Sequence, residues 1–192
     1  MGMTTAPKDK IIILPDDGLR RKSQRISQIT PEVKKIIDDM KAATLDWEAS
    51  RPHEVGVALA AIQIDQSLRI IIVRNNFDNK DDKSFSVFIN PEIVKKEGVL
   101  EEDFEGCLSV KDVYGKVPRY PKIRLRALDE EGRPIRVRAG GFLARVLQHE
   151  VDHLQGMVFV DHIENKPEAF YKLNNEGKLV PYEYDKVAYL FR

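Results

Sequence analysis

The sequence predicts an α+β fold, because two helical segments stand among a larger number of strand segments without a regular alternation of strand and helix. The first helix is predicted over about Pro31–Ala49, where Thr30 caps a segment that has Pro at its first position and apolar residues at helical spacing. The second is predicted over Phe142–Gln155, with Gly156 as its stop signal. A parallel sheet of repeated strand–helix–strand units is therefore not expected.

Four segments outside the helices have the composition or the alternation of strands. They are Ile70–Val73, Ser84–Ile89, Ile123–Leu128 and Ile135–Arg138. The turn residues Asp129–Gly132 join the last two segments and predict an antiparallel hairpin. The arginines that alternate with apolar residues in this hairpin are expected to form its solvated face.

Length and composition exclude several classes of protein. The chain has 192 residues, which favours a single domain over residues 1–192. Its 31 basic and 31 acidic side chains leave no excess positive charge of the kind that nucleic-acid-binding proteins carry. A single Cys excludes an internal disulfide framework, and no apolar run approaches the ~18 residues needed to cross a bilayer. The segment Met1–Ala6 lacks the features of a secretory signal, so a cytoplasmic location is expected.

The segment His149–His153 matches the pattern H-E-x-x-H inside the second predicted helix. At helical spacing His149 and His153 lie about 40° apart and Glu150 about 60° from His153, so all three project from one face. Two imidazoles one turn apart can bind a metal while the carboxylate reaches a water molecule. Because the pattern fixes only three positions, a chance match or a pair of satisfied core histidines is the alternative.

Two further segments carry residues that could complete such a site. Cys107 lies in Glu105–Ser109, and two His with one Cys leave an open position of the catalytic type around a tetrahedral metal. The alternative for this Cys is a small buried apolar side chain. The segment Gly56–Gln63 consists of small and apolar residues that end in an amide, which is compatible with a packed turn or with a functional Gln63.

These three segments, in this order, resemble the motifs of the peptide deformylases, G-x-G-L-A-A-x-Q, E-G-C-[LE]-S and H-E-x-D-H. The resemblance covers about residues 10–164 and leaves the structure of the C-terminal tail, 165–192, undefined. Three positions depart from the family pattern: Ala58 replaces Gly, Ile62 replaces Pro, and Lys111 stands where Pro is common. These departures concern the fit of the substrate and leave the residues of the metal chemistry intact.

The resemblance implies a fold in which antiparallel sheets surround the helix that carries the metal motif. It implies a metal-dependent hydrolase that removes the N-formyl group from the formyl-methionine of newly synthesised polypeptides and releases formate. One divalent ion per chain is expected, natively iron(II), with zinc, nickel or cobalt as substitutes. The expected partners are N-formyl-methionyl nascent peptides, and contact of the tail with the ribosome is left open.

The resemblance also assigns roles to individual residues. The metal ligands would be Cys107, His149 and His153, with Glu150 as the proton carrier. The Gln63 amide and the backbone N–H of Leu108 would bind the oxyanion, and Glu105 and Arg119 would form a supporting pair beside the ligands. The residues expected to contact substrate are Gly56, Val57, Ala58, Leu59, Glu105, Gly106, Phe142 and Val146.

Two other functions are compatible with the same residues. Another metallohydrolase of the H-E-x-x-H type would take its third ligand from a later His or Glu, and the later His is His162. A deformylase-like metal-binding protein with weak or altered activity is the second alternative, motivated by Ala58 and by the unfamiliar tail. Release of formate from a formyl-methionyl peptide separates these alternatives from a deformylase.

Overall fold

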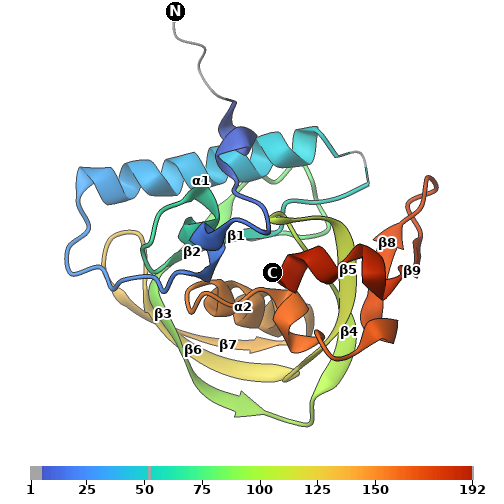
Figure 1. Cartoon of the computed structure of the whole chain (residues 1–192). Helices are drawn as coiled ribbons and strands as arrows, with labels where there is room; N and C mark the ends of the chain where they lie inside the picture. Colours follow the sequence, from blue (N-terminus) through green and yellow to red (C-terminus); the bar gives the residue numbers. More distant parts are fainter. Residues whose placement is uncertain (1–5, 52, 192) are drawn as a thin grey trace, which may run out of the picture.

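A five-stranded antiparallel sheet is the larger of the two sheets in the computed structural model, which describes residues 6–51 and 53–191 (Figure 1). Its order is β1-β2-β3-β6-β7. The strands are β1 (Ala58–Ala60), β2 (Ile70–Arg74), β3 (Phe85–Glu97), β6 (Lys122–Leu128) and β7 (Pro134–Gly140). The hairpin predicted from the Asp129–Gly132 turn is confirmed as β6–β7. Residues 1–5, on which the expectation about a targeting signal largely rests, lie outside the described range.

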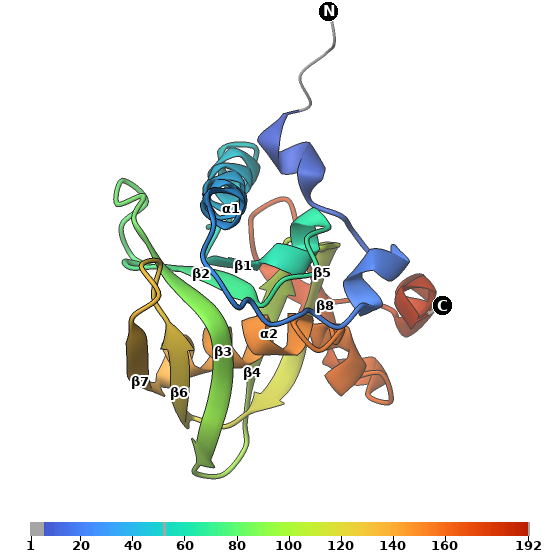
Figure 2. The same cartoon turned by 90° about the vertical axis from the view of Figure 1, so that its left-hand side faces the viewer.

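The strand β2 is buried on both faces, which explains its continuous apolar sequence. Ile70 and Ile72 pack against the helix α1 (Pro31–Ala49), whereas Ile71 and Val73 pack on the side of the helix α2 (Gly141–His153). Alternate residues of a strand point to opposite faces, so one short strand supplies two cores. This sheet therefore separates the two helices (Figure 2).

The helix α1 has the bounds predicted from the sequence. Thr30 Oγ1 accepts a hydrogen bond from the backbone N–H of Val33 at 3.4 Å, as an N-cap does. The buried face of α1, which includes Ile37 and Met40, packs on the sheet.

A second, four-stranded antiparallel sheet has the order β4-β5-β8-β9. Its strands are β4 (Glu101–Cys107), β5 (Val110–Arg119), β8 (Phe170–Leu173) and β9 (Leu179–Pro181). The tail left undefined by the sequence thus supplies two strands, followed by the 3₁₀ helices η6 (Tyr184–Lys186) and η7 (Ala188–Phe191). The other 3₁₀ helices are η1 (Pro7–Lys10), η2 (Asp17–Arg20), η3 (Ala61–Ile64), η4 (Phe159–His162) and η5 (Pro167–Ala169).

The helix α2 contacts both sheets. Its apolar side chains, including Leu147, pack on the five-stranded sheet, while Arg145 Nη1 donates a hydrogen bond to the carbonyl of Val117 in β5 at 2.7 Å. The helix ends at His153, two residues before the predicted end, and Gly156 lies beyond it at φ +78°. A Cβ at Gly156 would lie 2.3 Å from the carbonyl oxygen of Arg20, so the close approach of the two chain segments also requires glycine there.

Phe142, one of the residues expected to contact substrate, is exposed at the start of α2. Its side chain is 51 % exposed. Phe142 lies in the first turn of α2, where its ring packs edge-on against the ring of Phe77 with centroids 5.0 Å apart.

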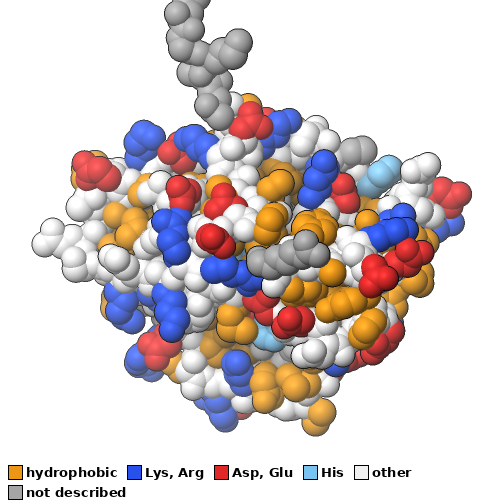
Figure 3. All heavy atoms as spheres, in the orientation of Figure 1, with side chains coloured by type: hydrophobic (Ala, Val, Ile, Leu, Met, Phe, Trp, Pro, Cys, Tyr) orange, Lys and Arg blue, Asp and Glu red, His pale blue; other side chains and the backbone are white. Residues whose placement is uncertain are grey.

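The surface carries basic and acidic side chains side by side, and hydrophobic side chains gather over the C-terminal segment in the view of Figure 3. Within the described residues, no helix combines the length and the apolar character needed to span a membrane.

Candidate active site

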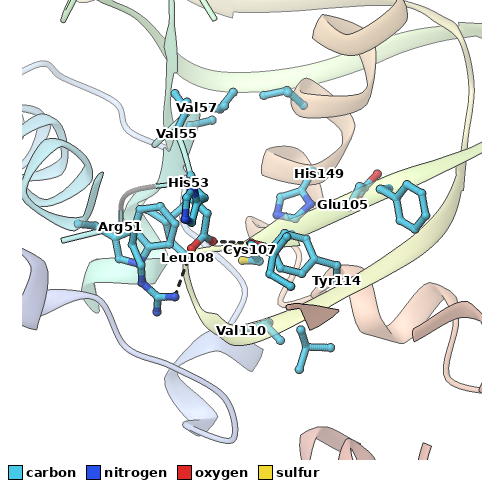
Figure 4. A pocket seen from close by; sticks show the side chains of 18 of the residues that line it. Arg51, His53, Val55, Val57, Glu105, Cys107, Leu108, Val110, Tyr114 and His149 are labelled. Carbon is cyan, nitrogen blue, oxygen red and sulfur yellow. Dashed lines mark hydrogen bonds and ion pairs between the residues drawn. The ribbon is translucent and has the colours of Figure 1, made fainter. Parts of the chain in front are cut away.

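Three side chains that are distant in sequence meet beside α2. Cys107 is the last residue of β4, and His149 and His153 lie one turn apart on α2. Their potential ligand atoms all lie within 4.8 Å of one another, and Cys107 Sγ is 3.3 Å from His153 Nε2. Figure 4 shows Cys107 and His149 facing the same space from the strand and from the helix. The spacing of the two histidines therefore directs both rings to one side of the helix, as predicted.

Glu105 fixes the orientation of the His149 ring. Its carboxylate oxygen Oε2 lies 2.9 Å from His149 Nδ1, and the same carboxylate accepts hydrogen bonds from Arg119 at 2.9 and 3.1 Å. Burial raises the pKa of Glu105, but the hydrogen bonds from His149 and Arg119 outweigh burial and hold the pKa well below its usual range. An ionised carboxylate can only accept hydrogen bonds, so Nδ1 of His149 carries a proton. The other ring nitrogen, Nε2, is then left to interact with the side chains around Cys107.

The electrostatics of the group favour a positive charge beside the thiol. Burial lowers the pKa of His149, but its hydrogen bonds to Cys107 and Glu105 prevail and raise the pKa well above the usual value. Burial and the charge of His149 lower the pKa of His153 well below the usual value, so this ring stays neutral and keeps a lone pair. A divalent cation satisfies the same requirement for positive charge, and the donor set of one thiol and two imidazoles fits such an ion.

A network of charges continues from Glu105, and beyond the expected Glu105–Arg119 pair it includes Arg145 and Asp152, to which the sequence analysis gave no role. Arg145 Nη1 donates to Glu105 at 2.8 Å, and Arg119 is only 5 % exposed and also bonds to Asp152. His162 Nε2 lies 2.7 Å from Asp152 Oδ2, so this His, the third ligand of the rival metallohydrolase, is engaged outside the ligand group. Arg145 and Asp152 stand four residues before and three after His149, a helical spacing that could have indicated them.

Glu150 is a buried carboxyl group that directly follows His149 in α2. It is 4 % exposed, and burial raises its pKa to about 7. In the described structure, two buried polar atoms here lack a hydrogen-bond partner, namely Glu150 Oε2 and His153 Nδ1. A carboxyl group with this pKa can take up and release a proton near neutral pH.

Gln63 directs its amide nitrogen towards Cys107. The short helix η3 follows β1 directly, and Gln63 Oε1 accepts a hydrogen bond from the backbone N–H of Ala60 at 2.8 Å. Its Nε2 then lies 3.0 Å from Ser109 Oγ and 3.4 Å from Cys107 Sγ. Ser109, which is fully buried, is a further residue to which the sequence analysis gave no role.

The backbone N–H of Leu108 lies in the turn between β4 and β5. It has no acceptor among residues 6–51 and 53–191. Leu108 directly follows Cys107 in the chain and also lines the cleft described next.

A cleft of about 740 Å³ opens over this group. Its walls include Gln63, Cys107, Leu108, His149 and Glu150. Six of the eight residues expected to contact substrate also line it: Val57, Ala58, Glu105, Gly106, Phe142 and Val146. The volume is within the range of about 300–1,000 Å³ that is typical of small-molecule sites.

Gly56 and Leu59 do not line the cleft, in contrast to the expectation from the family pattern. Leu59 is fully buried and packs with α1, because its neighbours Ala58 and Ala60 in β1 occupy the face directed at α2. Gly56 lies against α1, where a Cβ would be 2.7 Å from Cγ2 of Thr44, and its N–H donates to Glu48 at 2.8 Å.

Ala58 fits its position without backbone strain. The non-glycine residues with positive φ in the described structure are Asp65, Asn90 and Asp112, so Ala58 has an ordinary φ. It pairs with Val73 in the sheet. The departure from Gly at this position is therefore accommodated in a regular strand.

Comparisons with known proteins agree with this arrangement. A family model described as polypeptide deformylase matches residues 8–169. A curated peptide deformylase of Rhodopseudomonas palustris (strain BisB5) is 40 % identical over 163 residues, which cover 83 % of this chain and 88 % of the relative.

Solved structures give the same result. A peptide deformylase from Synechococcus elongatus in complex with actinonin has a TM-score of 0.73 at 36 % identity, covering 81 % of this chain and 80 % of that chain. A peptide deformylase from Legionella pneumophila has a TM-score of 0.70 at 38 % identity, covering 79 % of this chain and 83 % of that chain. The chain thus belongs to the peptide deformylase family, the enzymes that hydrolyse the N-formyl group from nascent peptides.

Proposed function

We propose that Cys107, His149 and His153 hold one divalent metal ion, and that Glu150, Gln63 and Leu108 carry out the deformylation of formyl-methionyl peptides beside it. The observation that supports this proposal most directly is the approach of the three ligand atoms to within 4.8 Å of one another at a cleft that Glu150 also lines. Burying a thiol and two imidazoles costs free energy unless their polar atoms are satisfied, and a bound ion would satisfy them.

The ion supplies Lewis-acid chemistry when it is bound, by polarising a carbonyl and lowering the pKa of water. Thiolate and imidazole ligands suit iron(II), zinc, nickel and cobalt. Membership of the family favours iron(II) as the native ion of this chain.

Glu150 carries the proton of the reaction. Its carboxylate accepts a proton from the attacking water as the water oxygen adds to the formyl carbon. It then delivers this proton to the amine nitrogen as the carbon–nitrogen bond breaks, which gives formate and a free N-terminal amine. A pKa of about 7 suits both transfers at neutral pH.

Gln63 and Leu108 provide hydrogen-bond donors for the oxyanion that forms on the formyl oxygen. The Gln63 amide nitrogen donates to Ser109 Oγ and to Cys107 Sγ, which places it beside the thiol. The free N–H of Leu108 is the second donor. Each such donor typically contributes on the order of 10²–10³ in rate.

The methionine side chain lies in the apolar part of the cleft. Val57, Ala58, Phe142 and Val146 supply apolar surface, and Gly106 lines the cleft without adding a side chain to it. A Cβ at Gly106 would lie 2.6 Å from the ring of Tyr114, so a side chain there would displace that ring.

Release of formate from formyl-Met-Ala tests the proposal. We expect formate release from this peptide, no acetate release from acetyl-Met-Ala, loss of activity with a chelator, and recovery when iron(II) is added without oxygen. Formate release that is unaffected by metal removal would contradict the assignment of the ligands. We also propose a cytoplasmic location, where newly synthesised chains are available; contact of the tail with the ribosome stays a prediction.

A further inference from the structure

A hairpin near the C-terminus borders the cleft. This C-terminal hairpin comprises residues 170–181, in which β8 pairs with β5 through Tyr171 and Tyr114, and β9 pairs with β8 (Figure 1). It begins where the match to the family model ends, at residue 169. The hairpin therefore lies outside the part of the chain that the family model matches.

The hairpin presents one apolar pair to the cleft. Leu173 and Leu179 are cross-strand partners, both are half-buried, and both line the cleft. The neighbouring pair, Lys172 and Val180, is offset by one residue and does not line it. Because side chains alternate along a strand, these two pairs face opposite sides of the hairpin.

The turn of the hairpin reaches the loop that follows α1. Gly177 has φ +74°, and a Cβ on it would lie 3.3 Å from Cγ of His53. The loop itself is joined to β5, because the hydroxyl of Tyr114 donates to Glu54 at 2.5 Å and Arg51 bonds to Asp112 at 2.6 Å. Residues of the loop, of β5 and of the hairpin all line the cleft, and Figure 4 shows Arg51, His53 and Tyr114 of the first two.

The hairpin is anchored in a packed core. Phe170, Val187 and Leu190 are each at most 1 % exposed and belong to the core under the four-stranded sheet. The ring of Phe170 packs edge-on against that of Tyr184, with centroids 5.6 Å apart. Leu173 and Leu179 therefore project from a wall of defined position.

We propose that the C-terminal hairpin binds an apolar side chain among the peptide residues that follow the formyl-methionine, with Leu173 and Leu179 as its specificity-determining residues. This inference rests on the proposed function of the cleft. Phe142 and Val146 line the cleft from α2, whereas Leu173 and Leu179 line it from the hairpin, in the same sheet as Phe104 and Tyr114. A peptide held by its formyl group near Cys107 thus has apolar surface available beyond the methionine.

The test uses formyl-Met-Ala-Ser-Ser and three versions of it that carry Leu at position 2, 3 or 4, with formyl-Met-Ala as the short reference. We expect Leu at one position to raise kcat/KM of the wild-type enzyme about fivefold to tenfold, through KM, because part of a leucine side chain leaves water. Leu173→Ala and Leu179→Ala should abolish this preference and leave formyl-Met-Ala unchanged. Val180→Ala, on the other face of the same hairpin, is the matched control and should keep the preference.

Three results would overturn the inference: no preference for Leu at any position in the wild-type enzyme, the same preference in both leucine variants, or an equal loss of activity on formyl-Met-Ala and on the longer peptides. The last result would show a structural role for the hairpin. A wild-type enzyme that releases no formate from any peptide would instead reject the proposed function, so the two failures are distinguishable.

Discussion

The carboxylate of Glu105 lies 2.9 Å from Nδ1 of His149 and at the same time accepts hydrogen bonds from two buried arginines, Arg119 and Arg145. One strand residue therefore positions the ring of a candidate ligand on a helix. Such partners orient an imidazole and raise its basicity as a ligand.

Replacing this partner should weaken metal binding. We expect Glu105→Gln to lower the affinity for the metal about 10–100-fold, the usual effect of removing a carboxylate behind a ligating His. Competition with a chelator of known affinity measures the change. Glu102→Gln removes an exposed carboxylate from the same strand and should bind metal as the wild type does. Equal affinities in all three proteins would contradict the role given to Glu105.

Glu105 should also make the stability of the fold sensitive to acid. The pKa of Glu105 is lowered in the folded chain, so its interactions contribute stability above the unfolded pKa of about 4.3, and this contribution is lost as the pH falls towards the folded pKa. With a chelator present throughout, we expect the Tm advantage of the wild type over Glu105→Gln to be constant from pH 7 to 5 and to shrink from about pH 4.3 downwards. An advantage that does not change with pH would show that the charge of Glu105 does not stabilise the fold.

Cys107→Ser should lose most of the bound metal, because a hydroxyl is a far weaker ligand than a thiolate for a borderline cation. Elemental analysis of protein purified without oxygen measures the occupancy. Full occupancy in this variant would remove Cys107 from the metal site.

Glu150→Gln should keep its metal and lose turnover by a factor of at least about 10², because the amide cannot carry the proton. Metal content and formate release are measured on the same sample. Glu164→Gln, a change of an exposed carboxylate, is the control and should be fully active. Turnover at the wild-type rate in Glu150→Gln would show that another group carries the proton.

Local signals allowed parts of the fold to be predicted from the sequence. The helix α1 has a cap, a Pro at its first position and a regular apolar face, and its predicted bounds agree with the structure. The strand β3 was predicted over 84–89 but extends over Phe85–Glu97. Its second half contains Pro91 and two adjacent lysines, Lys95 and Lys96, and the register of its pairing with β6 shifts twice. The alternation of apolar and polar residues that marks a strand is therefore lost there.

The ligand group was predictable because its residues stand in short motifs. Of the network behind it, the resemblance predicted the Glu105–Arg119 pair. Arg145 and Asp152 were not predicted, since they meet Glu105 or Arg119 only after β4, β5 and α2 have packed. The pairing of β8 with β5 is likewise a contact between segments more than 50 residues apart, and no local pattern near Tyr171 specifies it. Leu59 was assigned to the substrate by family position, whereas the alternation of β1 directs it to α1.

Ala58→Gly restores the family's residue at a position where Ala already has an ordinary backbone conformation. The added glycine increases the entropy of the unfolded chain and should lower the free energy of unfolding by about 0.5–1 kcal/mol. Because Ala58 lines the cleft and one methyl group is a small obstacle, we expect kcat/KM for a formyl-methionyl peptide to change by less than about tenfold, or ~1.4 kcal/mol. Ala60→Gly, on the same face of β1 but outside the cleft, should show the same loss of stability and wild-type kinetics. A gain of a hundredfold or more in Ala58→Gly would show that the methyl group obstructs the natural site, and would favour a deformylase-like protein of weak activity.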